Sequence, residues 1–328
     1  MMQPHNPLLK IEDLQVNFRG DETVARAVGG VSFHVGRQEI VCLVGESGCG
    51  KTITALSILG LVPTPPGEIA AGRILFEDND LLQLTEHQQR HIRGNHIAMV
   101  FQEPLTSLNP VFTIGDQIGE AIQTHQPTDK SRLKEKCIAL LADVGLPSPA
   151  EQLNSYPHQL SGGQRQRAMI AMALACDPDL IIADEPTTAL DVTVQAQIIA
   201  LFQSLQQTRA MSVLYITHDL GVVAEIADRV YVMYAGRIME QGSAHTVFRH
   251  ASHPYTQALL ASLPDRSKRG QRLYSIPGSV PNPAYLPVGC PFHPRCPHEQ
   301  PSCREGYPSM CDYGEDHLAR CPVLFAKV

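Results

Sequence analysis

The stretch "EIVCLVGESGCGKT", residues 39–52, decides the fold of this 328-residue chain. An apolar run ends at a glycine-rich turn, and the helical sequence "TALSILGL" (54–61) follows. The turn fits the pattern G-x-x-x-x-G-K-[ST], in which backbone N–H groups and a helix N-terminus surround a phosphate. A strand, a phosphate loop and a helix in this order predict an α/β nucleotide-binding fold. The candidate nucleotide-binding residues are Gly45, Glu46, Ser47, Gly48, Cys49, Gly50, Lys51 and Thr52.

Charged side chains at two places predict phosphate chemistry. Lys51 is expected to neutralise the β- and γ-phosphates, and Thr52 to hold Mg²⁺. Further along, "LIIADE" (180–185) ends an apolar strand in two carboxylates. Asp184 is expected to hold Mg²⁺ through water, and Glu185 to polarise the water that attacks the γ-phosphate. Alone, such a pair would indicate solvated loop acids, but the upstream phosphate loop favours the catalytic interpretation.

Apolar patterning divides the chain into residues 1–250 and an extension of residues 251–328. The first part contains four apolar runs that predict a mostly parallel sheet covered by helices. The alternating segments "LLKIEDLQVNF" and "AVGGVSFHV" predict an antiparallel layer beside it. Residues 105–178 show helical spacing and are expected to form a helical insertion. The four runs lie at 39–45, 180–185, 212–219 and 229–236.

Composition limits the class of protein. Hydrophobic residues make up 43% of the chain and charged residues 18%, as is typical of a folded globular protein. The beginning of the chain lacks the pattern of a signal peptide, and no apolar stretch reaches the length of a membrane span, so we expect a cytoplasmic protein. A formal net charge of -7 disfavours nucleic acid as the main partner.

The extension is rich in proline and contains five of the nine cysteines. Without an export signal, metal binding is a better interpretation of such thiols than a disulfide framework. Their spacings are wider than those of paired zinc knuckles, but four thiolates suit either zinc or an iron-sulfur cluster. The preceding stretch "DRSKRGQR" (265–272) is expected to be a solvated linker. The five residues are Cys290, Cys296, Cys303, Cys311 and Cys321.

The stretch "LSGGQ" (160–164) is a second helix start of phosphate-binding type. Ser161 fits a helix N-cap, and Gly162 and Gly163 allow the backbone to approach an anion. One nucleotide does not need two such sites. We therefore expect this helix start to face the nucleotide of a partner subunit.

Together these motifs resemble the ATP-binding cassette (ABC) ATPases, whose signature is LSGGQ and whose ATP molecules lie between two head-to-tail subunits. The resemblance spans residues from about 8 to 245 and includes the motif "ALD" (189–191). It implies a mixed sheet with a helical subdomain, and ATP and Mg²⁺ as cofactors. It also implies that Gln102 contacts Mg²⁺ and the attacking water, that His218 contacts the γ-phosphate, and that Asp191 lies at the subunit interface. The signature residues implied to face the partner's nucleotide are Ser161, Gly162, Gly163 and Gln164.

One feature departs from the family pattern. Many ABC ATPases place an aromatic ring against adenine, but "GDETVARAV" (20–28) has none. Phe18 is the nearest candidate, and it fits a core strand equally well.

The extension resembles a narrower group. "HPYTQALLASLP" (253–264) and "GCPFHPRCP" (289–297) are similar to the C-terminal extension of ATPases from bacterial importers of dipeptides, oligopeptides, glutathione or nickel. This resemblance implies that four cysteines ligate a [4Fe-4S] cluster and that Cys311 is spare; zinc or free thiols are the alternatives. His293, His298 and His317 are expected to be solvated loop residues instead of zinc ligands. The four implied ligands are Cys290, Cys296, Cys303 and Cys321.

The resemblance implies an ATP-hydrolysing subunit of a peptide importer at the cytoplasmic face of the bacterial inner membrane. Its expected partners are a second ATPase subunit of a related chain, two transmembrane permease subunits and an extracytoplasmic substrate-binding protein. Alternative substrates are nickel, a metallophore or glutathione. A soluble ABC ATPase acting on ribosomes or DNA, and a non-hydrolysing module of the same fold, are the rival functions.

Overall fold

The computed structural model describes residues 6–188, 190–263 and 274–325. The chain folds into two compact units. The first unit comprises Met1–Gly36, Ile40–Leu82 and Ile216–Val328, and the second comprises Arg37–Glu39 and Gln83–Tyr215. Across the described ranges, none of the helices combines the length and the apolar character that a membrane crossing requires.

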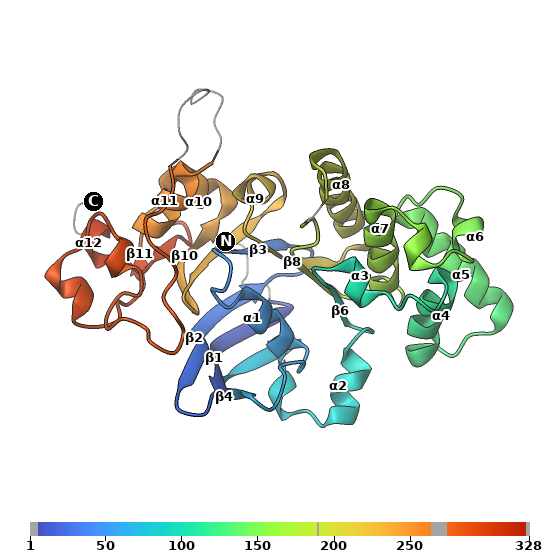
Figure 1. The fold of residues 1–328 in the computed structure, drawn as a ribbon, viewed down its shortest axis with the longest axis horizontal. Helices are drawn as coiled ribbons and strands as arrows, with labels where there is room; N and C mark the ends of the chain where they lie inside the picture. The colour runs from blue at the N-terminus through green and yellow to red at the C-terminus, as the bar shows by residue number, and fades with distance from the viewer. Residues whose placement is uncertain (1–5, 189, 264–273, 326–328) are drawn as a thin grey trace. The chain divides into compact units, whose positions relative to one another are not determined.

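The antiparallel layer of the first unit is built on β1 (Leu9–Arg19). This strand pairs antiparallel with β2 (Val24–Val35) on one side and with β4 (Gly67–Phe76) on the other (Figure 1). β5 (Asn79–Asp80) continues the layer beyond β4. Alternate side chains of β1 are buried, as the alternating sequence predicts. The predicted antiparallel layer is therefore confirmed.

The phosphate loop follows a strand of the second sheet of this unit. β3 (Ile40–Val44) pairs parallel with β9 (Arg229–Tyr234), which pairs antiparallel with β10 (Arg237–Ser243). All five residues of β3 are buried, which explains its continuous apolar sequence. The extension adds β12 (Leu318–Ala319) to the edge of β10, and β11 (Cys311–Asp312) pairs with β12. The extension is thus attached to the sheet by backbone hydrogen bonds.

The helices of the first unit include α1 (Lys51–Ile58), which begins at the phosphate loop, and a helix of the extension that begins at a proline. The helix α11 (Pro254–Ala261) starts with proline, at the first helical position, where a backbone N–H would have no partner within the helix. His253 caps this helix by accepting the Tyr255 N–H on Nδ1 at 3.0 Å. The helices of this unit are α1 (Lys51–Ile58), α9 (Leu220–Ile226), α10 (Ala244–His250), α11 (Pro254–Ala261) and α12 (Pro322–Phe325), with 3₁₀ turns at His293–Arg295 and Pro301–Arg304. The 3₁₀ turn Leu81–Gln83 lies where the sequence passes from the first unit to the second.

The second unit combines strands with the helical segment that the sequence predicts. β6 (Ile97–Val100) pairs parallel with β7 (Leu180–Asp184), and β8 (Ser212–Thr217) begins in the same unit. The chain between β6 and β7 is helical, and α4 buries Ile114, Ile118 and Ile122 on one face. The helices are α2 (Glu86–Ile92), α3 (Pro104–Ser107), α4 (Ile114–His125), α5 (Lys130–Asp143), α6 (Pro149–Gln152), α7 (Gly162–Ala173) and α8 (Val192–Arg209), with a 3₁₀ turn at Pro157–Gln159. The predicted mixed α/β fold is confirmed.

Candidate functional site

The phosphate loop connects β3 to α1 and depends on two glycines. A Cβ atom on Gly45 would clash with the carbonyl oxygen of Met233, and one on Gly50 with the carbonyl oxygen of Ala27. Gly50 also has φ 106°, a conformation that favours glycine. Among the described residues no side chain caps the start of α1 at Gly50. A helix N-terminus without a side-chain cap can donate its first N–H groups to a bound anion.

Lys51 lies beneath this loop. Its side chain is buried, and Nζ donates to the carbonyl oxygens of Gly45 at 2.8 Å and Glu46 at 3.1 Å. The ammonium group therefore contacts the loop that is predicted to bind the phosphates. Ser47, Gly48 and Thr52 are exposed, so the loop presents polar groups at the surface.

His218 belongs to the same unit as the loop. It follows β8 and precedes α9, whose first N–H groups are capped by Asp219 through a 2.8 Å bond from the Gly221 N–H. The His218 side chain is exposed. A cavity of about 410 Å³ is lined by His218 together with Gly45, Glu46 and Ser47. The structure thus brings these predicted site residues to one cavity.

The carboxylates of the second unit follow β7. Asp184 is buried at the end of the strand, and Glu185 has φ 46°, which is uncommon for a residue other than glycine. The Gln102 amide donates to Glu185 Oε2 at 3.3 Å, and the Thr188 hydroxyl to the same oxygen at 3.1 Å. Gln102 and Glu185 are thus in contact within this unit.

The signature segment begins α7 in the second unit. Ser161 accepts the Gln164 N–H at 3.3 Å, and the Gln164 side chain accepts the Ser161 N–H at 2.9 Å, which makes a capping box. A Cβ atom on Gly163 would lie 2.8 Å from Val194 Cγ1. Ser161 and Gly162 are exposed at the helix start. The predicted N-cap is present, and the glycine is also required by packing against α8.

Asp191 has a local structural role that the motif did not reveal. Its carboxylate caps α8 by accepting the Val194 N–H at 3.0 Å. An interface role remains an expectation. Of the other motif residues, Leu190 is described, whereas Ala189 lies outside the described residues, as does the stretch 265–272 that we expect to be a linker.

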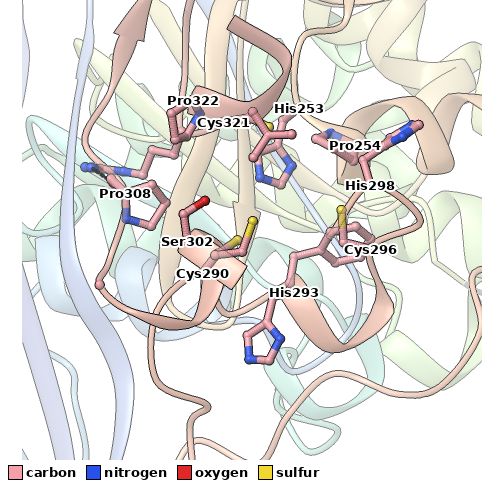
Figure 2. A pocket seen from close by; sticks show the side chains of 15 residues that line it. His253, Pro254, Cys290, His293, Cys296, His298, Ser302, Pro308, Cys321 and Pro322 are labelled. Atoms are coloured by element: carbon pink, nitrogen blue, oxygen red, sulfur yellow. Dashed lines mark hydrogen bonds between the residues drawn. The ribbon is translucent and has the colours of Figure 1, made fainter. Parts of the chain in front are cut away.

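Four cysteines of the extension line one small cavity, of about 40 Å³, in the first unit. Figure 2 shows Cys290, Cys296 and Cys321 around it, and Cys303 is the fourth. The backbone joins two of these segments, because the Cys290 N–H donates to the Cys303 carbonyl oxygen at 2.9 Å. Cys311 is not among the lining residues. The cavity therefore collects the four residues that the resemblance singled out.

Burial affects the chemistry of these thiols. It raises the pKa of Cys290 to about 11 and also raises the pKa of Cys296 and Cys321. Without a metal these groups are thiols at neutral pH, so metal binding would have to release protons. In the described part of the chain no three His, Cys, Asp or Glu side chains lie close enough together to hold one ion. The donors suit a metal group by type, but they do not form a closed single-ion site.

His317 differs from the expectation of a solvated loop residue, whereas His298 is exposed. His317 is 3% exposed, and its Nε2 lies 2.7 Å from Oε1 of the fully buried Glu240, so the expectation is wrong for this residue. The carboxylate of Glu240 also accepts the Ser252 N–H at 2.6 Å and the His253 N–H at 2.9 Å. His293 is among the residues that line the cysteine cavity, and its Nδ1 lies 2.9 Å from Glu299 Oε1 (Figure 2).

Sequence reasoning missed residues of the extension that contact the phosphate loop. The Glu46 N–H donates to the Tyr255 hydroxyl at 2.9 Å, and Tyr255 is fully buried. Arg295 pairs with the Glu46 side chain. The sequence "HPY" (253–255) could have drawn attention to Tyr255, because it belongs to the stretch that identified the extension. No local pattern distinguished Arg295.

Comparisons with known proteins are consistent with this geometry. A family model described as "ABC transporter" matches residues 28–188, and one described as "Oligopeptide/dipeptide transporter, C-terminal region" matches residues 239–303. The chain is 52% identical over 315 residues to the probable peptide ABC transporter ATP-binding protein y4tR of Sinorhizobium fredii, covering 96% of this chain and 94% of that protein. It is 47% identical over 314 residues to the dipeptide transport ATP-binding protein DppD of Bacillus subtilis, with coverage of 96% and 94%.

A solved structure supports the same conclusion. An ATP-binding cassette determined as a dimer in a post-hydrolysis state, bound to ADP and Pi, is similar to this chain with a TM-score of 0.65 and 25% identity. The similarity covers 72% of this chain and 98% of that one. The described residues carry the loop, the carboxylates and the signature helix in the order of the family. This chain belongs to the ABC transporter ATPases, in the branch that carries the oligopeptide/dipeptide transporter C-terminal region.

Proposed function

We propose that this chain hydrolyses ATP to energise the import of di- or oligopeptides through partner permease subunits. The observation that carries the proposal is the phosphate loop with its buried Lys51, in a chain whose extension matches the oligopeptide/dipeptide transporter family. The two relatives are named as peptide and dipeptide transport ATP-binding proteins. The phosphate loop supplies ATP binding, and the extension supports the peptide branch.

The residues of the nucleotide site have separate tasks in this proposal. Residues 45–52 bind the β- and γ-phosphates through backbone N–H groups and Lys51. Mg²⁺, when bound by Thr52, Asp184 and Gln102, supplies charge neutralisation of the phosphates. Glu185 orients the attacking water, and His218 contacts the γ-phosphate. Asp184 and Glu185 fit these tasks because one is buried at a strand end and the other is held by Gln102 and Thr188.

The signature helix provides the second half of each nucleotide site. Ser161 and Gly162 are exposed at the start of α7, and the first turn of this helix contains no acidic residue. Such a helix start attracts a phosphate. We propose that residues 161–164 bind the ATP held by a second ATPase subunit of a related chain. ATP binding would then close the dimer, and hydrolysis through Glu185 would reopen it.

The remaining assembly follows from the transport proposal. The ATPase dimer would lie on two permease subunits at the cytoplasmic face of the inner membrane, and an extracytoplasmic binding protein would deliver the peptide. The Gln102 loop would relay closure to the permeases. In this division residues 1–250 are the nucleotide-binding domain, residues 105–178 its helical subdomain, and residues 251–328 the extension.

We also propose that Cys290, Cys296, Cys303 and Cys321 hold a [4Fe-4S] cluster. All four line one cavity, and two of them are buried. Four cysteine thiolates are the ligand set of a [4Fe-4S] cluster, and zinc is the alternative that the same thiolates would suit. The cluster would cross-link a segment that has little regular structure of its own.

Reconstitution tests the proposed transport function. The chain should copurify with its permeases after coexpression, and ATP hydrolysis in proteoliposomes should rise when peptide-loaded binding protein is added. The matched control carries Glu185→Gln, which should show the same assembly but no stimulated hydrolysis. Copurification with ribosomes or DNA, without permeases, would instead support the soluble ATPase.

A further inference from the structure

Arg295 of the extension forms a buried, two-pronged ion pair with Glu46 of the phosphate loop. Its Nη1 lies 2.6 Å from Glu46 Oε2, and its Nη2 lies 3.0 Å from Glu46 Oε1. The guanidinium side chain is only 7% exposed. Nη1 also donates to the Tyr234 hydroxyl at 3.2 Å, and Nε to the Pro277 carbonyl oxygen at 2.8 Å. A planar guanidinium with these partners fixes the carboxylate in both position and orientation.

Glu46 connects this pair to the machinery of the loop. Its carbonyl oxygen accepts a hydrogen bond from Lys51 Nζ at 3.1 Å, and its N–H donates to the Tyr255 hydroxyl at 2.9 Å. The side chain and both backbone groups of one loop residue are therefore held. Two of its partners, Arg295 and Tyr255, come from the extension, whereas Lys51 and Cys49 belong to the loop itself. The position of the loop thus depends on residues about 200 or more positions away in sequence.

The other end of the connection is the cysteine cavity. Arg295 ends the 3₁₀ turn His293–Arg295, which lies between Cys290 and Cys296. The thiols of both cysteines line the cavity, whereas the Arg295 side chain lines the separate cavity beside the phosphate loop. The segment 290–296 therefore presents two cysteines to one cavity and Arg295 to the other. Any change that moves this turn moves the partner of Glu46.

We propose that Arg295 is a positioning residue for the phosphate loop and thereby sets the affinity for ATP. This inference rests on the proposed nucleotide site. Arg295 neutralises the Glu46 carboxylate, which otherwise would face the negative charges of the incoming triphosphate across the loop. The same contact fixes the start of the loop. Both effects act on the binding of ATP, whereas Glu185 keeps its own partners, so Arg295 is expected to control KM and not kcat.

A double-mutant cycle tests whether Arg295 acts through Glu46. Arg295→Met keeps most of the side-chain length and should raise the KM for ATP on the order of tenfold, with kcat changed by less than about twofold. The dissociation constant of a fluorescent ATP analogue should rise in parallel. In a Glu46→Gln background the same Arg295 substitution should change KM by less than about twofold, because no carboxylate remains to be neutralised.

Controls separate this role from general damage to the extension. Arg304→Met removes another arginine of the same segment, which pairs with Glu299 at 2.6 Å and is 66% exposed, and should leave KM unchanged. Arg295→Lys keeps the charge but loses the fork, so its KM should lie between those of the wild-type and the methionine variant. An equal effect of Arg295→Met in both backgrounds, or no effect on KM, would overturn the inference. Failure of the unaltered chain to hydrolyse ATP would overturn the proposed function instead.

Discussion

The side-chain amide of Gln102 lies 3.3 Å from Oε2 of Glu185, although 83 residues separate them in sequence. The Thr188 hydroxyl binds the same carboxylate oxygen at 3.1 Å. Glu185 itself has φ 46°, so its backbone conformation is one that few residues other than glycine adopt. These contacts fix the orientation of the Glu185 carboxylate.

Replacing Glu185 by glutamine should remove turnover but retain ATP binding. The amide keeps the size of the side chain but cannot accept a proton from water, so we expect kcat to fall at least about 100-fold. Phosphate release measures the turnover, and a fluorescent ATP analogue measures the binding. Unchanged hydrolysis in this variant would contradict the proposed role of Glu185. The control is Glu86→Gln, which makes the same substitution at the exposed start of α2 and should leave hydrolysis unchanged.

Replacing Ser161 by alanine should affect both stability and ATP-driven dimerisation. The change removes the N-cap of α7, which costs about 1 kcal/mol in the free energy of unfolding. If Ser161 also binds the partner's ATP, the ATP-dependent dimer measured by light scattering should weaken as well.

Thr113→Ala provides the matched control for this prediction. Thr113 caps α4 in the same unit with the same capping-box arrangement, and its loss should cost a similar free energy. It should leave the ATP-dependent dimer intact. Equal dimerisation defects in both variants would show that Ser161→Ala weakens the dimer only by destabilising the fold.

Acidic pH should destabilise the protein through His253. Burial lowers the pKa of this histidine to about 4, and the nearby Glu240 carboxylate opposes the shift only in part. The unfolded chain takes up a proton near pH 6.5, whereas the native state does not until about pH 4. The free energy of unfolding should therefore fall as the pH decreases through this window, by about 3 kcal/mol in total.

Urea unfolding of a His253→Asn variant isolates this contribution. Asparagine can still accept the N–H at the start of α11, but it does not titrate. The difference in unfolding free energy between the two proteins should change with pH between about 6.5 and 4. A difference that is constant over that range would show that His253 titrates normally in the native state.

Single cysteine substitutions should separate the proposed cluster ligands from Cys311. Cys290→Ser and Cys321→Ser should abolish iron and sulfide binding in anaerobically purified protein, and should lower the midpoint of thermal unfolding. Cys311→Ser should retain both, because this thiol does not line the cavity. Protein that contains zinc but no iron would refute the cluster, as would equal losses in all three variants.

Local sequence was sufficient for much of the fold and part of the candidate site. The alternating residues of β1, the fully apolar β3 and the spacing of Ile114, Ile118 and Ile122 each predicted the element that forms. The phosphate loop was also readable, because its chemistry depends on backbone N–H groups of contiguous residues. The capping box at Ser161 is local for the same reason.

Side-chain contacts between distant segments could not be read in this way. In a loop rich in proline and cysteine, Arg295 and His317 have the sequence environment of solvated residues, yet one is paired with Glu46 and the other with the buried Glu240. Their roles depend on the attachment of the extension to β10 through β12. A short strand of two residues carries too little periodicity to be predicted.

The motifs of this chain were enough to identify it as resembling the ABC ATPases with a cysteine-containing extension, because each motif lies within a short contiguous stretch. The contacts that hold the loop and the proposed catalytic carboxylate of Glu185 became visible in the folded structure. Charge pairing and burial depend on distances in space, and chain folding sets those distances for residues as far apart as Glu46 and Arg295.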